Sequence, residues 1–390
     1  MNWHGGCVRL ACDELKERVK GKKIALMMNT TALDNEGRFL LDRMVDEQWA
    51  SIAFLFGMEH GVRGNLFAGD GNLEMTDTRT GLPIVNLYDY PKCQPPAERL
   101  CEVDAVVFCA QDVGVRHWTY TPWMMLLLKS AATVGCEVII LDRPNPIRGD
   151  IVEGAPARTE YAGKHLLSGF EYPLRHGMTI GELALMYCDV KKLSLTPTVL
   201  RMEGWKREMW FSQTGLPWVP ASPNMPTTDT ALYFATTGLL QGSNLSLGAG
   251  STTPFQYVGG VDLDGEALAK ALNAQQLPGI SFLQKYYMTV PYERLYRGDR
   301  TPVLTDGVLL LIEDRDAFRA VDTQLVIMET LQKLFSNRVQ FDHHCVSRAR
   351  MGTDEICDAL AAGEGLSNIS AQWRADAEAF ARARTPYLLY

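Results

Sequence analysis

The alternation of short apolar runs with helical stretches in the first 150 residues restricts the fold of this chain more than any other feature. Stretches with apolar residues at helical spacing separate four continuous apolar runs. The runs are KKIALMMN (22–29), SIAFLFG (51–57), DAVVFCA (104–110) and CEVIILD (136–142). Strands that are apolar on both faces are typical of a parallel sheet that helices cover on both sides. We therefore predict an α/β fold with a Rossmann-like, doubly wound parallel sheet over residues 1–153.

The pattern changes after residue 153, and residues 154–390 are expected to form a second, smaller α/β domain. Thr179 and Glu182 have the spacing of a capping box, so a helix is expected to begin after Thr179. Further segments with the patterns of strands and of helices follow in this part of the chain. Those typical of strands are GISFLQKYYMTV (279–290) and GVLLLIED (307–314), and those typical of helices are EALAKALNA (266–274), VDTQLVIMETLQKLF (321–335) and AQWRADAEAFARA (371–383).

The composition excludes several classes of protein. Hydrophobic residues make up 46% of the chain, which is typical of a globular protein rather than a disordered one. The formal net charge is −8 and there is no run of Lys and Arg, so nucleic acid is not expected as a partner. The segment MMLLLKSAATV (124–134) is interrupted by Lys129 and is shorter than the roughly 18 residues that cross a bilayer, so no membrane partner is expected.

The N-terminus and the cysteines predict a cytoplasmic protein. The first residues, MNWHGGCVRLACDELKERVK, lack the basic start and apolar core of a signal peptide. The chain has nine cysteines, an odd number, without a C-x-x-C motif. Cys101, Cys109, Cys136 and Cys188 lie in apolar segments and are expected to be reduced core residues.

Polar residues follow three of the predicted strands. They are Glu59, His60 and Arg63 after the second run, Gln111, Asp112 and Arg116 after the third, and Asp142, Arg143, Asn145 and Glu153 after the fourth. Ligands of doubly wound proteins bind beyond the carboxyl ends of the strands. The sequence therefore predicts a site at this edge of the sheet.

Three carboxylates among these residues, Glu59, Asp112 and Glu153, suggest glycoside hydrolysis. In that reaction one carboxyl group protonates the leaving oxygen, while a second activates water or attacks the sugar. Glu59 ends an apolar strand, where burial can raise its pKa into the range of a general acid. The distance between the two carboxyl groups decides between retention and inversion of configuration, and the sequence leaves that distance open.

The remaining side chains at this edge have both structural and functional interpretations. His60 can orient Glu59, contact substrate or serve as a hydrogen-bonded core residue. Arg63, Arg116 and Arg143 can bind an anionic substrate group, because a guanidinium group forms a fork onto a carboxylate. Equally, Arg116 can pair with Asp112, and Arg143 with Asp142, only to support the fold.

Other motifs are weak, and neither a metal nor a cofactor is expected. FDHHC (341–345) offers Asp342, His343, His344 and Cys345, but no second cluster has the spacing of a zinc site. GDGN (69–72) and GAGS (248–251) do not match the G-x-G-x-x-G fingerprint of a nucleotide site, and no G-x-S-x-G elbow is present. A nucleotide-dependent enzyme, which the fold class alone would permit, is therefore not favoured.

Eight stretches, taken in order and with their spacing, resemble one known family. They are GMEHGVRG (57–64), TGLPIVNLY (80–88), QDVGVRHWTY (111–120), LDRPNPIRGDIVEG (141–154), HGMTIGELALMY (176–187), MEGWKRE (202–208), TGLPWVPASPNMPT (214–227) and GLLQGSNLS (238–246). The resemblance is to the bacterial exo-β-N-acetylmuramidase family, long catalogued as a domain of unknown function. It extends from about Lys22 to the C-terminal helices and implies two domains with a cleft between them.

The resemblance also implies an activity and a set of site residues. Members of the family remove N-acetylmuramic acid from the non-reducing end of peptidoglycan fragments, so the implied partner is an amino sugar or a muropeptide. Glu59 matches the family's catalytic acid/base, and Glu153 is the implied second carboxylate. Asp112, Arg116, Asp142, Arg143 and Asn145 match other positions at the strand ends, and Asn224 and Thr227 are expected to line the cleft from the second domain.

The chain departs from the family in one Gly-rich loop, SLGAGSTTPFQ (246–256), and by Met58 where proline usually precedes the glutamate. The family usually has charged residues at four loop positions that are occupied here by Leu247, Ala249, Thr253 and Gln256. If a lost arginine binds the lactyl carboxylate of muramic acid, a contact worth about 1.5–3 kcal/mol disappears.

Several consequences of this departure remain open. Another arginine at the sheet edge can replace the lost contact, the substrate can be an uncharged N-acetylhexosamine, or the loop charges can have served only to pair with one another. An alternative function is a catalytically weakened amino-sugar-binding protein on the same scaffold. The sequence also leaves open the oligomeric state and whether the acetamido group assists the reaction.

Overall fold

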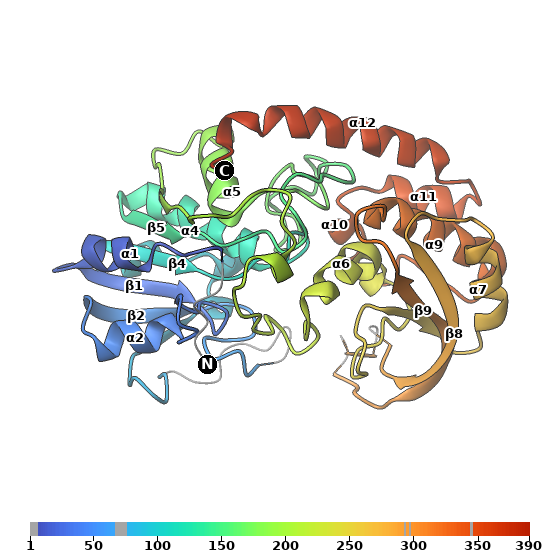
Figure 1. Cartoon of the computed structure of the whole chain (residues 1–390), viewed down its shortest axis with the longest axis horizontal. Coiled ribbons are helices and arrows are strands. Elements are labelled where there is room, and N and C mark those ends of the chain that lie inside the picture. Colours follow the sequence, from blue (N-terminus) through green and yellow to red (C-terminus); the bar gives the residue numbers. More distant parts are fainter. Residues whose placement is uncertain (1–6, 67–75, 292–293, 296–297, 344–345) are drawn as a thin grey trace.

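The computed structural model describes residues 7–66, 76–291, 294–295, 298–343 and 346–390. Figure 1 shows an elongated molecule with one sheet towards each end and helix α12 (Ser367–Ala383) running along one side of both. No helix in these described ranges is sufficiently long and apolar to span a bilayer.

The first sheet has six parallel strands in the order β3-β2-β1-β4-β5-β6. The strands are β1 (Lys23–Met28), β2 (Ser51–Gly57), β3 (Ile84–Asn86), β4 (Ala105–Cys109), β5 (Glu137–Leu141) and β6 (Thr198–Leu200). The four predicted strands are confirmed as β1, β2, β4 and β5. Because strand order reverses between β1 and β4, the switch point where such sheets bind ligands lies between these two strands.

Helices cover both faces of this sheet, and the alternation of residues in β1 shows why. Ile24 and Leu26 belong to one buried cluster, together with residues of α1 (Cys12–Val19) and α2 (Leu40–Asp46). Ala25 and Met27 belong to a second cluster, which α4 (Tyr120–Val134) and α5 (Ile180–Val190) join from the opposite face. A strand segment buried on both sides must be apolar, and β1 has this property from Ile24 to Met28.

The predicted domain boundary between residues 153 and 154 does not coincide with the end of this sheet. Both α5 and β6 come later in the chain, and β6 pairs with β5. The expected capping box of α5 is confirmed, since Thr179 Oγ1 accepts from Glu182 N and Glu182 Oε2 accepts from Thr179 N. The first sheet therefore extends to Leu200.

The second, smaller sheet is antiparallel, with the order β7-β9-β8. Its strands are β7 (Tyr257–Gly260), β8 (Ile280–Thr289) and β9 (Val303–Ile312), so both strands predicted in this domain are confirmed. The remaining α-helices are α3 (Ala97–Leu100), α6 (Thr228–Thr237), α7 (Gly265–Asn273), α9 (Ala320–Phe335), α10 (Ser347–Met351) and α11 (Glu355–Ala361). Five short 3₁₀ helices complete the described elements: η1 (Leu87–Asp89), η2 (Pro91–Cys93), η3 (Phe211–Gln213), η4 (Gly238–Gly242) and η5 (Thr385–Tyr387).

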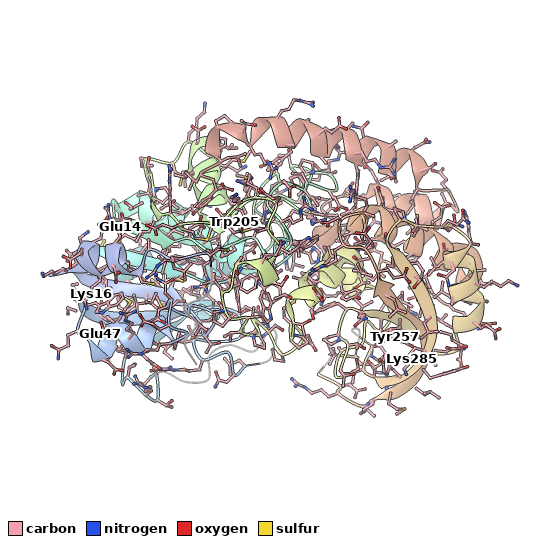
Figure 2. All side chains as sticks on the ribbon, viewed as in Figure 1. Glu14, Lys16, Glu47, Trp205, Tyr257 and Lys285 are labelled. Atoms are coloured by element: carbon pink, nitrogen blue, oxygen red, sulfur yellow. The ribbon has the colours of Figure 1, made fainter. Side chains whose placement is uncertain are left out.

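The chain returns to the first domain after α12, which joins the two domains a second time (Figure 1). The hydroxyl group of Tyr390 donates to Asp142 Oδ2 over 2.8 Å, and Leu389 N donates to Glu182 Oε1 over 2.8 Å. The ring of Tyr390 packs edge-on against Trp205, which Figure 2 labels in the first domain, with ring centroids 5.1 Å apart. The end of the described chain is thus packed into the N-terminal domain.

The described cysteines are unpaired, and their burial agrees with three of the four expectations. Cys109, Cys136 and Cys188 are buried, as predicted. Cys101 is exposed, because it follows the short helix α3 and precedes β4 instead of lying within the strand. Cys345 falls outside the described residues.

Candidate active site

The loops on both sides of the switch point are joined by hydrogen bonds. Asn29 and Thr31 follow β1, whereas Gln111 follows β4. Gln111 N donates to Thr31 Oγ1 over 2.9 Å, and Thr31 Oγ1 donates to Asn29 Oδ1 over 2.6 Å. All three residues are buried. The sheet therefore presents a fixed polar edge where ligands of such folds bind.

Glu59 lies at this edge, two residues beyond β2, and its side chain is 9% exposed. The hydroxyl group of Tyr88, in η1, donates to Glu59 Oε2. Burial, followed by the charge of Glu59, raises the pKa of Tyr88 above its usual range, so this phenol is protonated at physiological pH and acts as a hydrogen-bond donor.

A second phenol, Tyr120, lies close to the same carboxylate. Burial and then the charge of Glu59 raise the pKa of Tyr120. Its hydroxyl group donates to the carbonyl oxygen of Ala221 over 2.6 Å and also hydrogen-bonds with Asn29. This connects the Glu59 environment to the segment 214–227.

The chain turns sharply immediately after Glu59. His60 adopts a left-handed conformation with φ 66°, and Gly61 follows with φ 74°. A non-glycine residue in this region is strained, and such strain is concentrated at functional sites. The ring Nδ1 of His60 lies 3.0 Å from the carbonyl oxygen of Leu66, so His60 stabilises its own loop, and its ring centroid lies 6.4 Å from that of Trp118.

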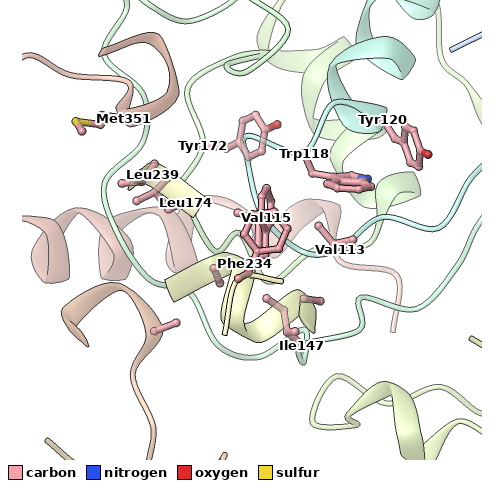
Figure 3. Packing of buried hydrophobic residues seen from close by; sticks show 14 of the residues in the cluster. Val113, Val115, Trp118, Tyr120, Ile147, Tyr172, Leu174, Phe234, Leu239 and Met351 are labelled. Atoms are coloured by element: carbon pink, nitrogen blue, oxygen red, sulfur yellow. The ribbon is translucent and has the colours of Figure 1, made fainter. Parts of the chain in front are cut away.

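Aromatic side chains from both domains pack beside this loop. Trp118 contacts Tyr120 edge-on, with centroids 5.3 Å apart, and Phe234 of α6 edge-on, with centroids 5.7 Å apart. Figure 3 shows these three rings within the buried cluster that continues to Leu239 and Met351. The Glu59 edge is therefore supported by the core that joins the domains.

The guanidinium group of Arg63 binds two aspartates of the chain and is therefore not available for an anionic substrate group. Its guanidinium group donates to both oxygens of Asp77, over 2.7 Å each, and to both oxygens of Asp42, over 3.1 and 2.9 Å. These hydrogen bonds, that to Asp77 above all, raise the pKa of Arg63. Although burial opposes it, the hydrogen bonds from Arg63 and Thr80 lower the pKa of Asp77 to about 2.

Arg116 is completely buried and joins the two domains. One of its terminal nitrogens donates to the carbonyl oxygens of Ala155 and Tyr172, over 2.9 and 3.1 Å. The other donates to those of Arg350 and Met351, over 3.3 and 2.5 Å. Since the terminal nitrogens are used on backbone carbonyls, the prediction that Arg116 binds substrate finds no support here.

Arg143 and Asn145 also hold backbone segments together. Arg143 donates to the carbonyl oxygen of Leu33 over 2.9 Å and to Gln111 Oε1 over 3.3 Å. Asn145 Nδ2 donates to the carbonyl oxygen of Met178 over 3.0 Å. Both side chains are buried, so their contacts point to a supporting function at the strand ends.

The two ion pairs considered as a structural alternative, Asp112 with Arg116 and Asp142 with Arg143, do not form. Asp112 accepts from Gly114 N over 2.7 Å and from Thr121 Oγ1 over 3.1 Å, and His176 Nε2 lies 3.2 Å from its Oδ2. Arg116 is instead bound to carbonyl oxygens. The contact with Thr121 fixes Asp112 to the first turn of α4, next to Tyr120.

Asp142 likewise has partners other than Arg143. It accepts from Thr179 Oγ1 over 2.7 Å, from Gly181 N over 2.9 Å and from Tyr390 Oη over 2.8 Å. Burial raises the pKa of Asp142. The carboxylate joins the end of β5 to the start of α5 and to the end of the described chain, where it has no access to a substrate because it is completely buried.

Glu153 lies at the joint between the domains. Arg175, whose side chain is completely buried, donates to Glu153 Oε1 over 2.5 Å. Val321 N, at the start of α9, donates to Glu153 Oε2 over 3.0 Å. Both carboxylate oxygens of Glu153 accept hydrogen bonds, and neither donor is a residue that contacts Glu59 in the descriptions above. These contacts therefore do not support the prediction that the two glutamates act as a catalytic pair.

The segment containing Asn224 and Thr227 follows Ala221, to which Tyr120 is bound. Thr227 Oγ1 accepts from Thr230 N over 3.3 Å and begins α6 as its N-cap. Asn224 is half-buried, and its backbone N–H donates to Ser222 Oγ over 3.2 Å. Asn224 thus remains a candidate substrate-binding residue, whereas the side chain of Thr227 serves the helix.

The four uncharged positions of the Gly-rich loop fit their surroundings. Leu247 and Ala249 are buried in the core cluster, at 0% and 3% exposure. Thr253 Oγ1 donates to Tyr287 Oη over 3.0 Å, and Gln256 Nε2 donates to the carbonyl oxygen of Leu310 over 3.0 Å. Apolar side chains at the first two positions need no charge partner.

Within the described residues, no three His, Cys, Asp or Glu side chains are grouped as metal ligands would be. In the FDHHC segment, Asp342 pairs with Arg348 over 2.6 Å, and His343 Nδ1 lies 2.6 Å from Gln340 Oε1. His344 and Cys345 fall outside the described residues.

Tyr88 and Tyr120 were not among the predicted site residues. Both lie in stretches that carry the family resemblance, TGLPIVNLY and QDVGVRHWTY. Tyr88 follows β3, which has only three residues and gives no recognisable strand pattern. Tyr120 begins a helix, where an aromatic residue is typical of the core.

The comparisons with known proteins cover nearly the whole chain. Residues 24–229 match the family model described as exo-β-N-acetylmuramidase NamZ, N-terminal, and residues 232–390 match the corresponding C-terminal model. The two models meet near residue 230, and we propose that the domain boundary lies there instead of at residue 153.

One curated relative and two solved structures are similar over almost their full lengths. The relative is the peptidoglycan β-N-acetylmuramidase NamZ of Bacillus subtilis, 34% identical over 97% of this chain and 89% of the relative. The structures are two DUF1343-family proteins of Bacteroides fragilis. One has a TM-score of 0.86 and 31% identity, the other a TM-score of 0.76 and 26% identity, and each alignment covers 98% of this chain and 99% of that protein. The chain therefore belongs to the exo-β-N-acetylmuramidase family.

Proposed function

We propose that this protein is an exo-acting glycoside hydrolase that releases terminal N-acetylmuramic acid from peptidoglycan fragments, with Glu59 as its acid/base. The observation that carries the proposal is the position of Glu59: a nearly buried carboxyl group next to the switch point of a parallel sheet, hydrogen-bonded by a phenol and followed by a strained turn. Membership of the family supports the reaction class.

In this reaction Glu59 donates a proton to the glycosidic oxygen as the bond to the sugar breaks. Water supplies the hydroxyl group that bonds to the anomeric carbon, and its remaining proton returns to the carboxylate of Glu59. Asp112 and Glu153 take supporting functions, because their oxygens are engaged by donors within the fold. Asp112 fixes the start of α4, which carries Tyr120, and Glu153 fixes the start of α9 against the first domain.

A second candidate substrate is an uncharged N-acetylhexosamine. Three arginines were candidates for binding an anionic substrate group, and all three donate to groups within the chain: Arg63, Arg116 and Arg143. The loop side chains Leu247 and Ala249 are uncharged and buried. If no cation meets the lactyl group, muramic acid loses a contact worth about 1.5–3 kcal/mol, which is a factor of about ten to a hundred in affinity.

We propose that the protein acts in the cytoplasm, as a recycling enzyme for small wall fragments. The described cysteines are unpaired, which suits a reducing compartment. Fractionation of producing cells, with the protein detected by antibody, tests this location.

The activity is tested with a panel of aryl β-glycosides of N-acetylmuramic acid and N-acetylglucosamine. Glu59→Gln should reduce kcat by about 10²–10⁴-fold, the usual contribution of a general acid. Full turnover by this variant would remove Glu59 from the mechanism. Calorimetry separates hydrolysis from the alternative of a binding protein, because tight sugar binding without release of the aryl group favours binding alone.

A further inference from the structure

We propose that Tyr88 is a positioning residue, whose hydroxyl group holds the carboxyl group of Glu59 in the orientation needed for proton transfer. The inference rests on the proposed function of Glu59 and extends it to a second residue. It depends on three independent features of the fold: the strand register, the turn that carries Tyr88 and the packing of its ring.

The register of β2 and β3 places the two residues at the same level. Gly57 pairs with Asn86 in parallel register at the ends of the two strands. Glu59 lies two residues beyond Gly57, and Tyr88 lies two residues beyond Asn86. Neighbouring parallel strands are about 4.8 Å apart, so side chains that leave both strands at this level come within hydrogen-bonding distance.

The turn after β3 is fixed by Asn86. Its side-chain oxygen accepts from Tyr88 N over 3.2 Å, and its Nδ2 donates to Asp89 Oδ1 over 3.0 Å. This arrangement begins η1 and gives Tyr88 a defined backbone direction. The Tyr88 ring then packs edge-on against Trp123 of α4, with centroids 5.5 Å apart at an interplanar angle of 80°. A phenol held at both its backbone and its ring loses little freedom when it donates.

Among the described residues, the titratable side chains that interact with the charge of Glu59 include two phenols and a thiol, and His60 is its neighbour in the chain. Tyr88 lies in η1, Tyr120 in α4 and Cys93 in η2. Burial is the main cause that raises the pKa of each side chain, and the charge of Glu59 raises it further. Of these three residues, Tyr88 donates a hydrogen bond to Glu59 through its hydroxyl group. This hydrogen bond holds one oxygen of the Glu59 carboxyl group in a defined direction.

The test is the pH profile of kcat/KM for Tyr88→Phe on an aryl glycoside. A general acid works when protonated, so activity falls as pH rises through its pKa. Removing one hydrogen bond to the charged form should move this alkaline limb to higher pH by about one to two units. The looser carboxyl group should also lower kcat by about ten- to a hundredfold at the optimum. The inference is overturned if the alkaline limb of the Tyr88→Phe profile lies at the same pH as that of the wild type.

Two further variants distinguish positioning from a general effect on the fold. Tyr161→Phe removes a matched bond, from a tyrosine to Asp354 Oδ1 over 2.5 Å in the region of α11, and should leave the profile unchanged. Replacing Tyr88 with 3-fluorotyrosine keeps the shape and strengthens the donor, so the limb should move to lower pH. If both Tyr88 variants match the wild-type profile while Glu59→Gln is inactive, the positioning function fails and the proposed activity stands. If Glu59→Gln is active, the proposed activity itself fails.

Discussion

Glu153→Gln separates the two interpretations of this residue, as a catalytic carboxylate or as a structural anchor between the domains. The side chain is 9% exposed, and its partner Arg175 is completely buried. Removing one member of a buried ion pair costs about 3–5 kcal/mol, because the other charge remains without compensation. Glutamine retains an oxygen for Val321 N, so we expect the lower end of this range, a loss of about 3 kcal/mol in the free energy of unfolding.

Urea unfolding measures this loss, and turnover of an aryl glycoside measures catalysis in the same preparation. We expect kcat to stay within about threefold of wild type, because an anchoring charge contributes little to the chemical step. Glu355→Gln is the matched control: it removes an exposed ion pair to Arg158 of 2.7 Å, and its unfolding midpoint should hardly move. A fall in kcat of about 10²–10⁴-fold with unchanged stability would refute the reasoning and restore Glu153 as a catalytic group.

Two other predictions concern Arg63 and its buried partner. Arg63→Met should destabilise the protein by about 3 kcal/mol, since Asp77 is left buried and unpaired, yet it should leave the ratio of kcat/KM between muramic and glucosamine glycosides unchanged. A selective loss on the muramic substrate would instead show that Arg63 binds its carboxylate. The folded-state pKa of Asp77 is lowered to about 2, so its contribution of about 2 kcal/mol is complete above the unfolded pKa of about 4 and disappears as pH falls towards 2. Unfolding measured from pH 5 to pH 2 should show this loss in the wild type and a smaller one in Arg63→Met.

The sheet was predictable because its central strands are buried on both faces. β1, β2, β4 and β5 are five to seven residues long and apolar apart from the first residue of β1, β2 and β5, and each contributes side chains to the core. β3 and β6 have three residues each, which is too short for a pattern to emerge. Because β6 was not recognised, the predicted boundary at residue 153 falls before the last strand of the first sheet, and because β3 was not recognised, Tyr88 had no predicted position next to Glu59.

The sequence proposes a location for the site but does not give the partners of its charges. The rule that ligands bind beyond strand ends led to Glu59, which the structure places two residues beyond β2. It does not reveal that Asp42 and Asp77 both bind Arg63, or that Arg116 donates to carbonyl oxygens of Ala155 and Met351. Such partners depend on tertiary packing between segments up to 235 residues apart in the chain.

The course of the final helix has a practical consequence for dividing this protein. A fragment cut near residue 230 would keep every strand of the first sheet but would lose Leu389 and Tyr390, which cover Glu182 and Asp142. The buried carboxyl groups of Glu182 and Asp142 would then become accessible to water, and each would lose one hydrogen-bond donor. The N-terminal half should therefore be produced together with a peptide carrying these last residues, or as a circularly permuted chain that begins with them.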